Sequence, residues 1–256
     1  GENQLKSFTA EAYASGKTLA RTGIEVINAT TVFAKAGYTL NESLKLAEQA
    51  LLLTNIADGI TDVGDASNSL IAILKGYKLE ISSTSHVVDL LNEVSNRYAV
   101  ETDNLTNGLT RASGTLAQTG TSVEELTGIL TGGYEVLRNM EKVSTGLITI
   151  SQRLRGVTEE GEEVEDLIPK LQEAFLKYAN TDINKPNGEL KSTFEILESL
   201  QKAWGSMTDK ERQYVGELSA GINFEGGSGF FVDLSGFFCC FSHTALSSAG
   251  GTNFFF

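Results

Sequence analysis

The sequence predicts an all-α protein: a multi-helix antiparallel bundle of about ten helices linked by helix-turn-helix joints, followed by an irregular tail rich in Phe and Gly. The 256 residues include only two prolines, and a proline-poor chain rich in Ala, Leu and Glu favours long helices over strands. Apolar residues recur three and four positions apart, as on the buried face of a helix. Short segments with a glycine and then a hydroxyl residue separate these stretches. The chain is therefore expected to alternate helices with tight joints.

The segment 117–126 contains the clearest joint. Gly120 is suited to end one helix, because glycine adopts the left-handed conformation of a helix C-terminus without steric cost. Ser122 and Glu125 have the spacing of a capping box, which starts the next helix. The same order of residues recurs at Gly37, Thr39 and Glu42, and a further capping box is expected at Thr208 and Glu211.

The expected helices follow one another along the chain with short gaps. In the first half the ranges are 4–35, as one helix or as two joined near Ser15 and Gly16, then 40–57, 66–75, 85–98 and 102–118. In the second half they are 122–138, 142–155, 166–178, 190–204 and 209–220. Arg153 and Arg155 precede Gly156 and are interpreted as a helix C-terminus, where basic side chains meet the negative end of the helix dipole.

Composition divides the chain into four parts. We expect a helical core at 1–157, an acidic linker at 158–165, a C-terminal helical part at 166–222 and an atypical tail at 223–256. The segment 224–256 holds nine of the thirteen phenylalanines and both cysteines, and it has no Lys or Arg. A shifted reading frame explains this change better than a membrane-seeking or aggregating tail, so we expect the tail to be non-native or disordered.

Charge and cysteine content exclude several classes of protein. The net charge of −13 disfavours nucleic-acid binding, which depends on Lys and Arg displacing counterions from phosphates. Cys239 and Cys240 are adjacent, which is neither a disulfide framework nor a zinc-ligand spacing. No apolar run is long enough for a membrane span. The first Met is Met140, so we interpret the chain as a piece of a longer protein.

No catalytic, cofactor-binding or metal-binding residues are predicted. The segment 16–18 imitates the end of a phosphate-binding loop, but Glu11 stands where that loop needs glycine. The acidic segment 58–65 lacks the late Glu of a calcium loop. His86 has no second His and no Cys nearby in the sequence, and 226–230 ends in Phe where a nucleophile motif needs glycine. Helix caps and turns explain these segments better.

Several segments along the chain occur in an order and spacing typical of one protein family. They are AKAGYTLNE at 34–42, HVVDLLNEV at 86–94, ITISQRLRG at 148–156, NGELKSTFEIL at 187–197 and LSAG at 218–221. On these segments, residues 4–221 resemble the core region of phage tail tape-measure proteins. After residue 221 the chain departs from the family pattern.

The resemblance implies a structural component of a phage or prophage tail, with no enzymatic activity. Such a protein occupies the tail lumen, sets the tail length, and leaves ahead of the DNA at injection; it is in the host cytoplasm during assembly. The implied partners are the tail tube protein, the tail-tip or distal tail protein, the tail assembly chaperone and further copies of itself, through coiled-coil or similar helical contacts. A helical secreted or surface interaction module is the alternative. A cell-wall-degrading enzyme would need a site that the sequence does not contain.

Overall fold

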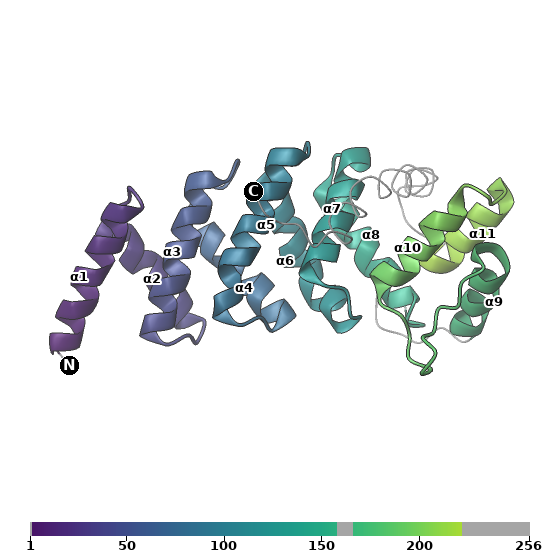
Figure 1. Cartoon of the computed structure of the whole chain (residues 1–256), viewed down its shortest axis with the longest axis horizontal. Coiled ribbons are helices and arrows are strands. Elements are labelled where there is room, and N and C mark those ends of the chain that lie inside the picture. Colours follow the sequence, from purple (N-terminus) through teal and green to yellow (C-terminus); the bar gives the residue numbers. More distant parts are fainter. Residues whose placement is uncertain (1, 158–165, 222–256) are drawn as a thin grey trace. The chain divides into compact units, whose positions relative to one another are not determined.

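The computed structural model describes residues 2–157 and 166–221 (Figure 1). These residues form eleven α-helices and one short 3-10 helix, and Asn184 and Leu190 form an isolated β bridge. The predicted all-α fold is confirmed. The helices are α1 (Glu2–Thr18), α2 (Gly23–Lys35), α3 (Leu40–Ile56), α4 (Val63–Tyr77), α5 (Thr84–Arg97), α6 (Thr102–Gln118), α7 (Val123–Leu137), α8 (Met140–Arg153), α9 (Leu167–Ala179), α10 (Thr193–Trp204) and α11 (Asp209–Ala220), with the 3-10 helix η1 (Ile81–Ser83) before α5.

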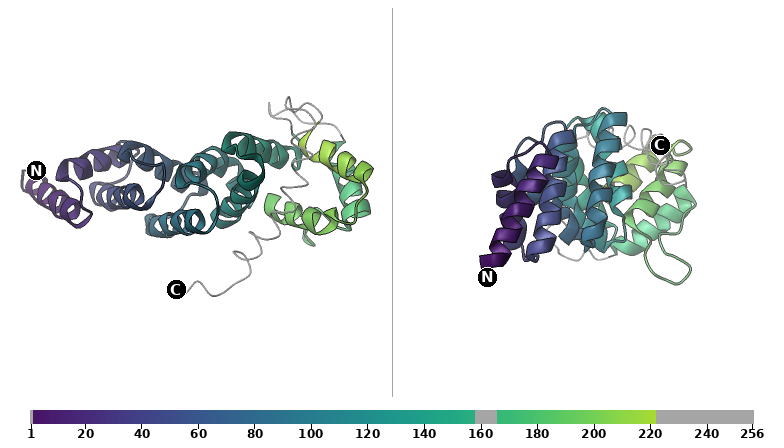
Figure 2. Two further views of the ribbon diagram at one scale, coloured as in Figure 1. Left: turned by 90° about the horizontal axis from the view of Figure 1, so that it is seen from above. Right: turned by 60° about the vertical axis from the view of Figure 1, so that its left-hand side comes forward.

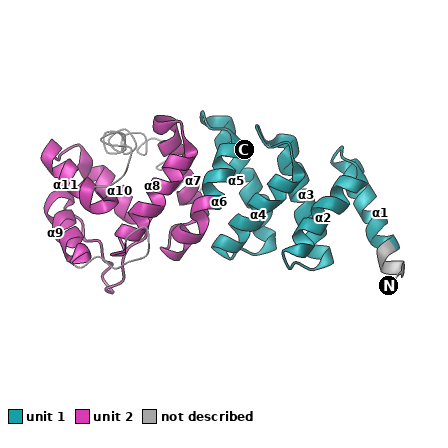
Figure 3. Ribbon diagram, turned by 180° about the vertical axis from the view of Figure 1, so that it is seen from behind, with its two compact units in different colours: residues 1–110 teal, residues 111–256 magenta. Residues whose placement is uncertain are grey.

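The chain divides into two compact units, residues 1–110 and 111–256, coloured separately in Figure 3. The division falls within α6. The predicted acidic linker at 158–165 and the predicted tail at 223–256 lie outside the described residues. The four-part domain division made from composition therefore stays a prediction.

In unit 1, helices that follow one another in the chain also pack against one another. The helix α2 packs on α1 and α3, and α3 packs on α4. Contacts also join each of α2 and α3 to the second helix after it, so that α2 touches α4 and α3 touches α5, as the views in Figures 1 and 2 show. Ala12, Val26 and Leu51 come from three different helices and form a buried apolar cluster. Each helix of unit 1 thus buries its apolar face against near neighbours in the chain.

In unit 2, contacts between distant parts of the chain are more prominent. The helix α8 packs on α7 and on α11, α9 packs on α10 and α11, and α7 contacts α10.

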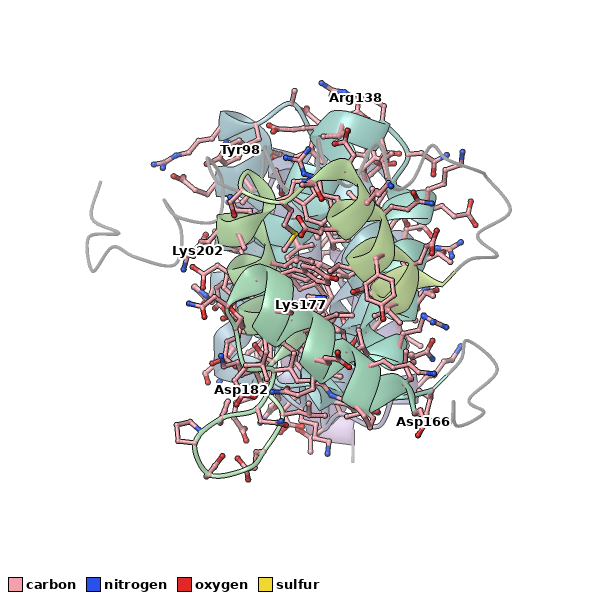
Figure 4. All side chains as sticks on the ribbon, turned by 90° about the vertical axis from the view of Figure 1, so that its right-hand side faces the viewer. Tyr98, Arg138, Asp166, Lys177, Asp182 and Lys202 are labelled. Carbon is pink, nitrogen blue, oxygen red and sulfur yellow. The ribbon has the colours of Figure 1, made fainter. Side chains whose placement is uncertain are left out.

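Figure 4 views this unit with Lys177 of α9 and Asp182 of the following loop labelled. Asp182 accepts hydrogen bonds from Gln172 Nε2 at 2.9 Å and from Asn184 N at 2.7 Å, which orders the loop. The Lys177 ammonium lies 4.9 Å from the ring centre of Tyr178.

Capping boxes start five of the helices. At α7 the Glu125 amide donates to Ser122 Oγ at 3.1 Å, and the Ser122 amide donates to the Glu125 carboxylate at 2.8 Å. The predicted boxes at α3, α7 and α11 are confirmed. Sequence reasoning missed two more, which begin at Thr22 and Ser192. Both have Glu three residues later, so the same pattern could have identified them.

We expect Ser122→Ala to lower the free energy of unfolding by about 1 kcal/mol, because the first turn of α7 loses its side-chain acceptor. Chemical denaturation followed by circular dichroism measures the change. Ser122→Thr is the matched control, since Thr serves as the cap at α2, α3 and α11. Equal stability of the alanine and threonine variants would contradict the capping role.

The predicted helix ends are partly confirmed. Gly37 and Gly120 follow helix ends with φ of 100° and 77°, the left-handed backbone that glycine was expected to supply. Residues other than glycine adopt this left-handed backbone after α4, α7 and α9, where Lys78, Arg138 and Asn180 have φ of 53°, 49° and 48°. The expected helix 66–75 was too short, because Gly76 also lies inside α4. Asp62, outside the expected range, caps the start of that helix.

Of the two alternatives for 4–35, the structure has two helices, but their joint follows Thr18, because Ser15 and Gly16 both lie within α1. The chain turns after Thr18, and the capping box at Thr22 starts α2. The Arg21 amide donates to the Gly16 carbonyl at 2.7 Å. A Cβ at residue 16 would lie 2.9 Å from the Arg21 carbonyl oxygen, so glycine here allows the joint to fold tightly over the end of α1.

Candidate functional site: the junction around Arg155

Three segments of unit 2 meet at one polar junction. They are the joint between α6 and α7, the end of α8 and the start of α10. A Cβ at Gly120 would lie 3.6 Å from the Cβ of Ser192, so the two joints are in van der Waals proximity. The Phe194 amide, in the first turn of α10, donates to Thr121 Oγ1 at 3.4 Å. The joint at 117–126 therefore packs against the capping-box joint that begins at Ser192.

Arg155 connects these segments. Its Nη2 donates to the carbonyl oxygens of Thr119 at 3.1 Å and Lys191 at 3.0 Å. The side chain reaches them because α8 ends at Arg153 and the backbone turns at Gly156, which has φ of 81°. Burial lowers the pKa of the Arg155 guanidinium. Among the described residues, its buried Nη1 has no hydrogen-bond partner.

Three hydroxyl groups form a small network in the same junction. Ser151 Oγ lies 2.9 Å from Thr193 Oγ1 and 3.3 Å from Thr119 Oγ1, and Thr193 donates to Thr119 at 3.0 Å. Ser151 and Thr193 are fully buried. Because buried hydroxyls are stabilised by partners, this network favours one arrangement of the three segments.

Arg153 connects α8 to the end of α11. Its Nε donates to the Leu218 carbonyl at 3.1 Å, and a Cβ at Gly221 would lie 3.4 Å from its guanidinium carbon. Partial burial lowers the pKa of Arg153. The interpretation of Arg153 and Arg155 as a simple helix terminus was therefore incomplete. Both side chains bind carbonyl groups of other segments.

Two capping glutamates have opposite pKa shifts. Burial raises the pKa of Glu125, partly offset by the hydrogen bond from the Ser122 amide, and the negative charges of Glu195 and Glu124 raise it further. The pKa of Glu195 is lowered, first by the hydrogen bond from the Ser192 amide and then by Lys185, whose Nζ lies 3.6 Å away. The two capping boxes are alike in sequence, but their different tertiary surroundings shift the pKa values of their glutamates in opposite directions.

A family model described as phage-related minor tail protein matches residues 9–218 of the chain. The chain belongs to this family. The matched range contains every junction residue that donates or accepts the hydrogen bonds described above. No solved structure matches this minor tail protein.

The junction of the tail protein contains hydrogen-bonding groups that hold helices together. Its hydroxyls donate to one another or to carbonyls, and its arginines bind backbone oxygens. Of the segments considered for chemistry, residues 16–18 form the last turn of α1, Asp62 caps α4, and His86 lies in the first turn of α5. Within residues 2–157 and 166–221, no group of three or more His, Cys, Asp or Glu residues is arranged to hold a metal ion. The absence of catalytic and cofactor residues remains a prediction.

Two further predictions concern membrane spans and the residues 223–256. In the part of the chain that the structure describes, no helix of the minor tail protein is long and apolar enough to span a membrane. Cys239, Cys240 and the segment 226–230 lie outside the described residues. The junction was not identifiable from the sequence, although the position of Arg155 directly before Gly156, a residue suited to turn the chain, was a partial signal.

We expect Glu125→Gln to become more stable relative to the wild type as the pH rises from about 4 to 7. A raised folded-state pKa means that the folded protein binds the proton more tightly than the unfolded chain. Ionisation of Glu125 therefore lowers the free energy of unfolding across this range, and glutamine avoids that loss. Denaturation at a series of pH values measures the difference.

Glu195→Gln is the matched control with the opposite sign. The folded-state pKa of Glu195 is lowered, so its ionised form stabilises the fold, and this stabilisation is lost as the pH falls through the lowered pKa. The Glu195 variant should therefore become less stable relative to the wild type as the pH rises. Parallel pH profiles for the two variants would contradict the assigned difference.

Proposed function

We propose that this minor tail protein is the core region of a tape-measure protein, which governs tail length and tail assembly and leaves ahead of the DNA at injection. The observation that carries the proposal is the family match across 9–218, together with the tape-measure segments in their expected order along the same range. We place the protein in the tail lumen of the virion, and in the host cytoplasm during assembly.

The proposed role requires binding rather than catalysis. The partners are the tail tube protein, the tail-tip or distal tail protein, the tail assembly chaperone and further copies of the chain. Serial packing of helices in unit 1 supports the role, because a chain whose near neighbours contact one another can be lengthened or shortened by whole helices. The net charge of −13 is compatible with a lumen through which DNA passes, since like charges repel.

Changing the length of the coding sequence tests the ruler function, in which the length of the protein sets the length of the tail. Removing residues 23–77, which contain α2, α3 and α4, should shorten the tail by about 80 Å if this segment is extended helix in the virion, because a helix rises about 1.5 Å per residue. Duplicating the same residues should lengthen it by a similar amount. Electron microscopy of phage carrying the altered full-length gene measures tail length.

One control separates the effect of chain length from the effect of folding. A phage with Gly16→Ala keeps the chain length while disturbing α1, so its tails should have normal length even if fewer assemble. Tails of unchanged length in both the deletion and the duplication would reject a ruler role for these residues. In that case the compact arrangement of helices, with its closed joints, would favour an assembly platform or plug.

The helical secreted or surface interaction module remains the alternative function. Detecting the protein with an antibody in purified fractions distinguishes the two proposals. A tail protein copurifies with phage particles, whereas a surface module copurifies with the host envelope. The family match favours the first outcome.

A further inference from the structure

The helix α1 is attached to the rest of unit 1 by few apolar contacts. It packs mainly on α2, as Figure 1 shows at the purple end of the chain. Among its described side chains, at 6–18, Ala12 is the apolar one that is fully buried, in a cluster with Val26 of α2 and Leu51 of α3. Beside this cluster, an open hollow of about 330 Å³ lies between α1 and α3. Because burial stabilises in proportion to apolar area, releasing α1 costs less than releasing a helix that is buried along its whole length.

The joint that connects α1 to α2, at 19–22, contains a strained residue. Ala20 has φ of 55°, a left-handed backbone in which the Cβ of a residue other than glycine crowds a carbonyl oxygen. In the joint after α2, Gly37 occupies the corresponding position. The closed joint also depends on Gly16, because a Cβ there would lie 2.9 Å from the Arg21 carbonyl oxygen. Straightening the joint into a helix relieves both constraints.

Hydrogen bonds to α3 hold this strained joint closed. Asn55 Nδ2, in the last turn of α3, donates to the Leu19 carbonyl oxygen at 2.8 Å. Arg21 Nε donates to Asn55 Oδ1 at 2.8 Å, and Arg21 Nη2 donates to Thr54 Oγ1 at 3.0 Å. Asn55 thus binds the residues on both sides of Ala20. In a continuous helix the Leu19 carbonyl would point along the helix axis to the amide four residues later, so straightening the joint breaks its bond to Asn55.

A straightened joint would merge α1 and α2 into one helix. Residues 2–35 contain no proline, and the merged helix would be about 50 Å long. It would carry α1 away from the surface that α1 covers on α2 and α3. A second copy of the chain supplies an identical α1 that fits this surface. Exchange of an identical element between copies forms a dimer without new kinds of contact, and short strained hinges favour it.

We propose that the joint at 19–22 is a latched hinge, and that its opening forms a dimer in which two copies of the chain exchange α1. The strain at Ala20 favours the open form. The bonds of Asn55 and the capping box at Thr22 favour the closed form. Because two molecules combine, the balance shifts toward the dimer as the protein concentration rises. The inference concerns unit 1 and does not depend on the tail-length function.

Refolding the full chain at a series of concentrations, followed by size-exclusion chromatography with light scattering, measures the dissociation constant of the dimer. Gly16→Ala and Asn55→Ala should each lower this constant at least about tenfold, because the first obstructs the closed joint and the second removes its latch in both copies. Adding Ala20→Gly to either variant should raise the constant again at least about tenfold. Glycine adopts the left-handed backbone without strain and disfavours the continuous helix.

Two matched controls separate hinge opening from a general loss of stability. Gly114→Ala adds a Cβ to a helix at a position that no other segment approaches within 4 Å. Asn96→Ala removes an exposed asparagine whose amide nitrogen bonds to Asn92 within α5. Both should leave the dissociation constant unchanged. The proposal is overturned if either control promotes the dimer as strongly as Gly16→Ala, or if Gly16→Ala and Asn55→Ala both stay monomeric at every concentration.

Cross-linking shows whether α1 is the exchanged element. Ser15 Oγ of α1 donates to the Glu48 carboxylate of α3, so these two positions adjoin. One copy carries Ser15→Cys and a mass tag, the other carries Glu48→Cys, and both carry Gly16→Ala, Cys239→Ser and Cys240→Ser. After the two copies are refolded together, a short bismaleimide should join copies of different mass, whereas copies refolded separately and then mixed at low concentration should not be joined. A dimer without this cross-link would overturn the exchange of α1.

Discussion

Replacing Arg155 by alanine is expected to lower the free energy of unfolding by about 2–4 kcal/mol. The alanine variant loses the hydrogen bonds to the carbonyls of Thr119 and Lys191 and leaves both without this charged donor. Chemical denaturation followed by circular dichroism measures the loss.

Arg155→Lys should recover only part of this stability. Lysine has a single ammonium group on a flexible stem and cannot reproduce the fork of guanidinium donors. Arg111→Ala is the matched control, because the side chain of Arg111 is 48% exposed and pairs with Glu141 at the surface. Such a pair contributes about 0–1 kcal/mol. If the Arg155 and Arg111 variants lose similar amounts, Arg155 does not connect the segments of unit 2 in solution.

Gly16→Ala is expected to destabilise unit 1 by about 1–3 kcal/mol. Alanine normally stabilises a helix relative to glycine by about 1 kcal/mol, so the expected sign is the reverse of the usual one. The added Cβ would lie 2.9 Å from the backbone of Arg21 and Thr22, and backbone atoms in a tight joint cannot move aside cheaply. Thermal and chemical denaturation measure the change.

Gly23 and Gly114 provide graded controls. A Cβ at Gly23 would lie 2.7 Å from the ring of Tyr13, which is 55% exposed and can rotate away, so Gly23→Ala should cost little. A Cβ at Gly114 would meet no other atom within 4 Å, so Gly114→Ala should follow helix propensity and stabilise α6. A stabilising effect of Gly16→Ala would show that the joint after α1 is looser than the structure indicates.

Most of the helical structure was predictable from the sequence because its signals are local. A capping box joins residues only three positions apart, as at Ser122 and Glu125, and its bonds form wherever the helix starts. Gly37 and Gly120 could likewise be assigned as helix ends, since their left-handed backbone depends on the residue itself. The missed boxes at α2 and α10 carry the same signal.

Errors arose where a residue acts outside its own helix. Gly16 was one candidate position for a joint between two helices, but it lies within α1. Its role is instead to let the chain return closely over α1. The interpretation of 58–65 as caps and turns holds at Asp62, whose side chain accepts the hydrogen bond that starts α4, but the expected helix 66–75 began too late. Local patterns identify the residue type needed, but they do not show which neighbouring segment approaches it.

The sequence by itself determined the all-α class, the succession of helices and most of their ends, because these depend on residues within one helical turn. Only the tertiary structure decided which joints meet. Thr193 and Thr119 are 74 positions apart in the chain and are hydrogen-bonded at 3.0 Å. The bonds of Arg155 and the raised pKa of Glu125 depend on the same meeting of distant segments. Such contacts form when apolar faces pack together, and side-chain spacing along the chain carries no record of which faces will meet.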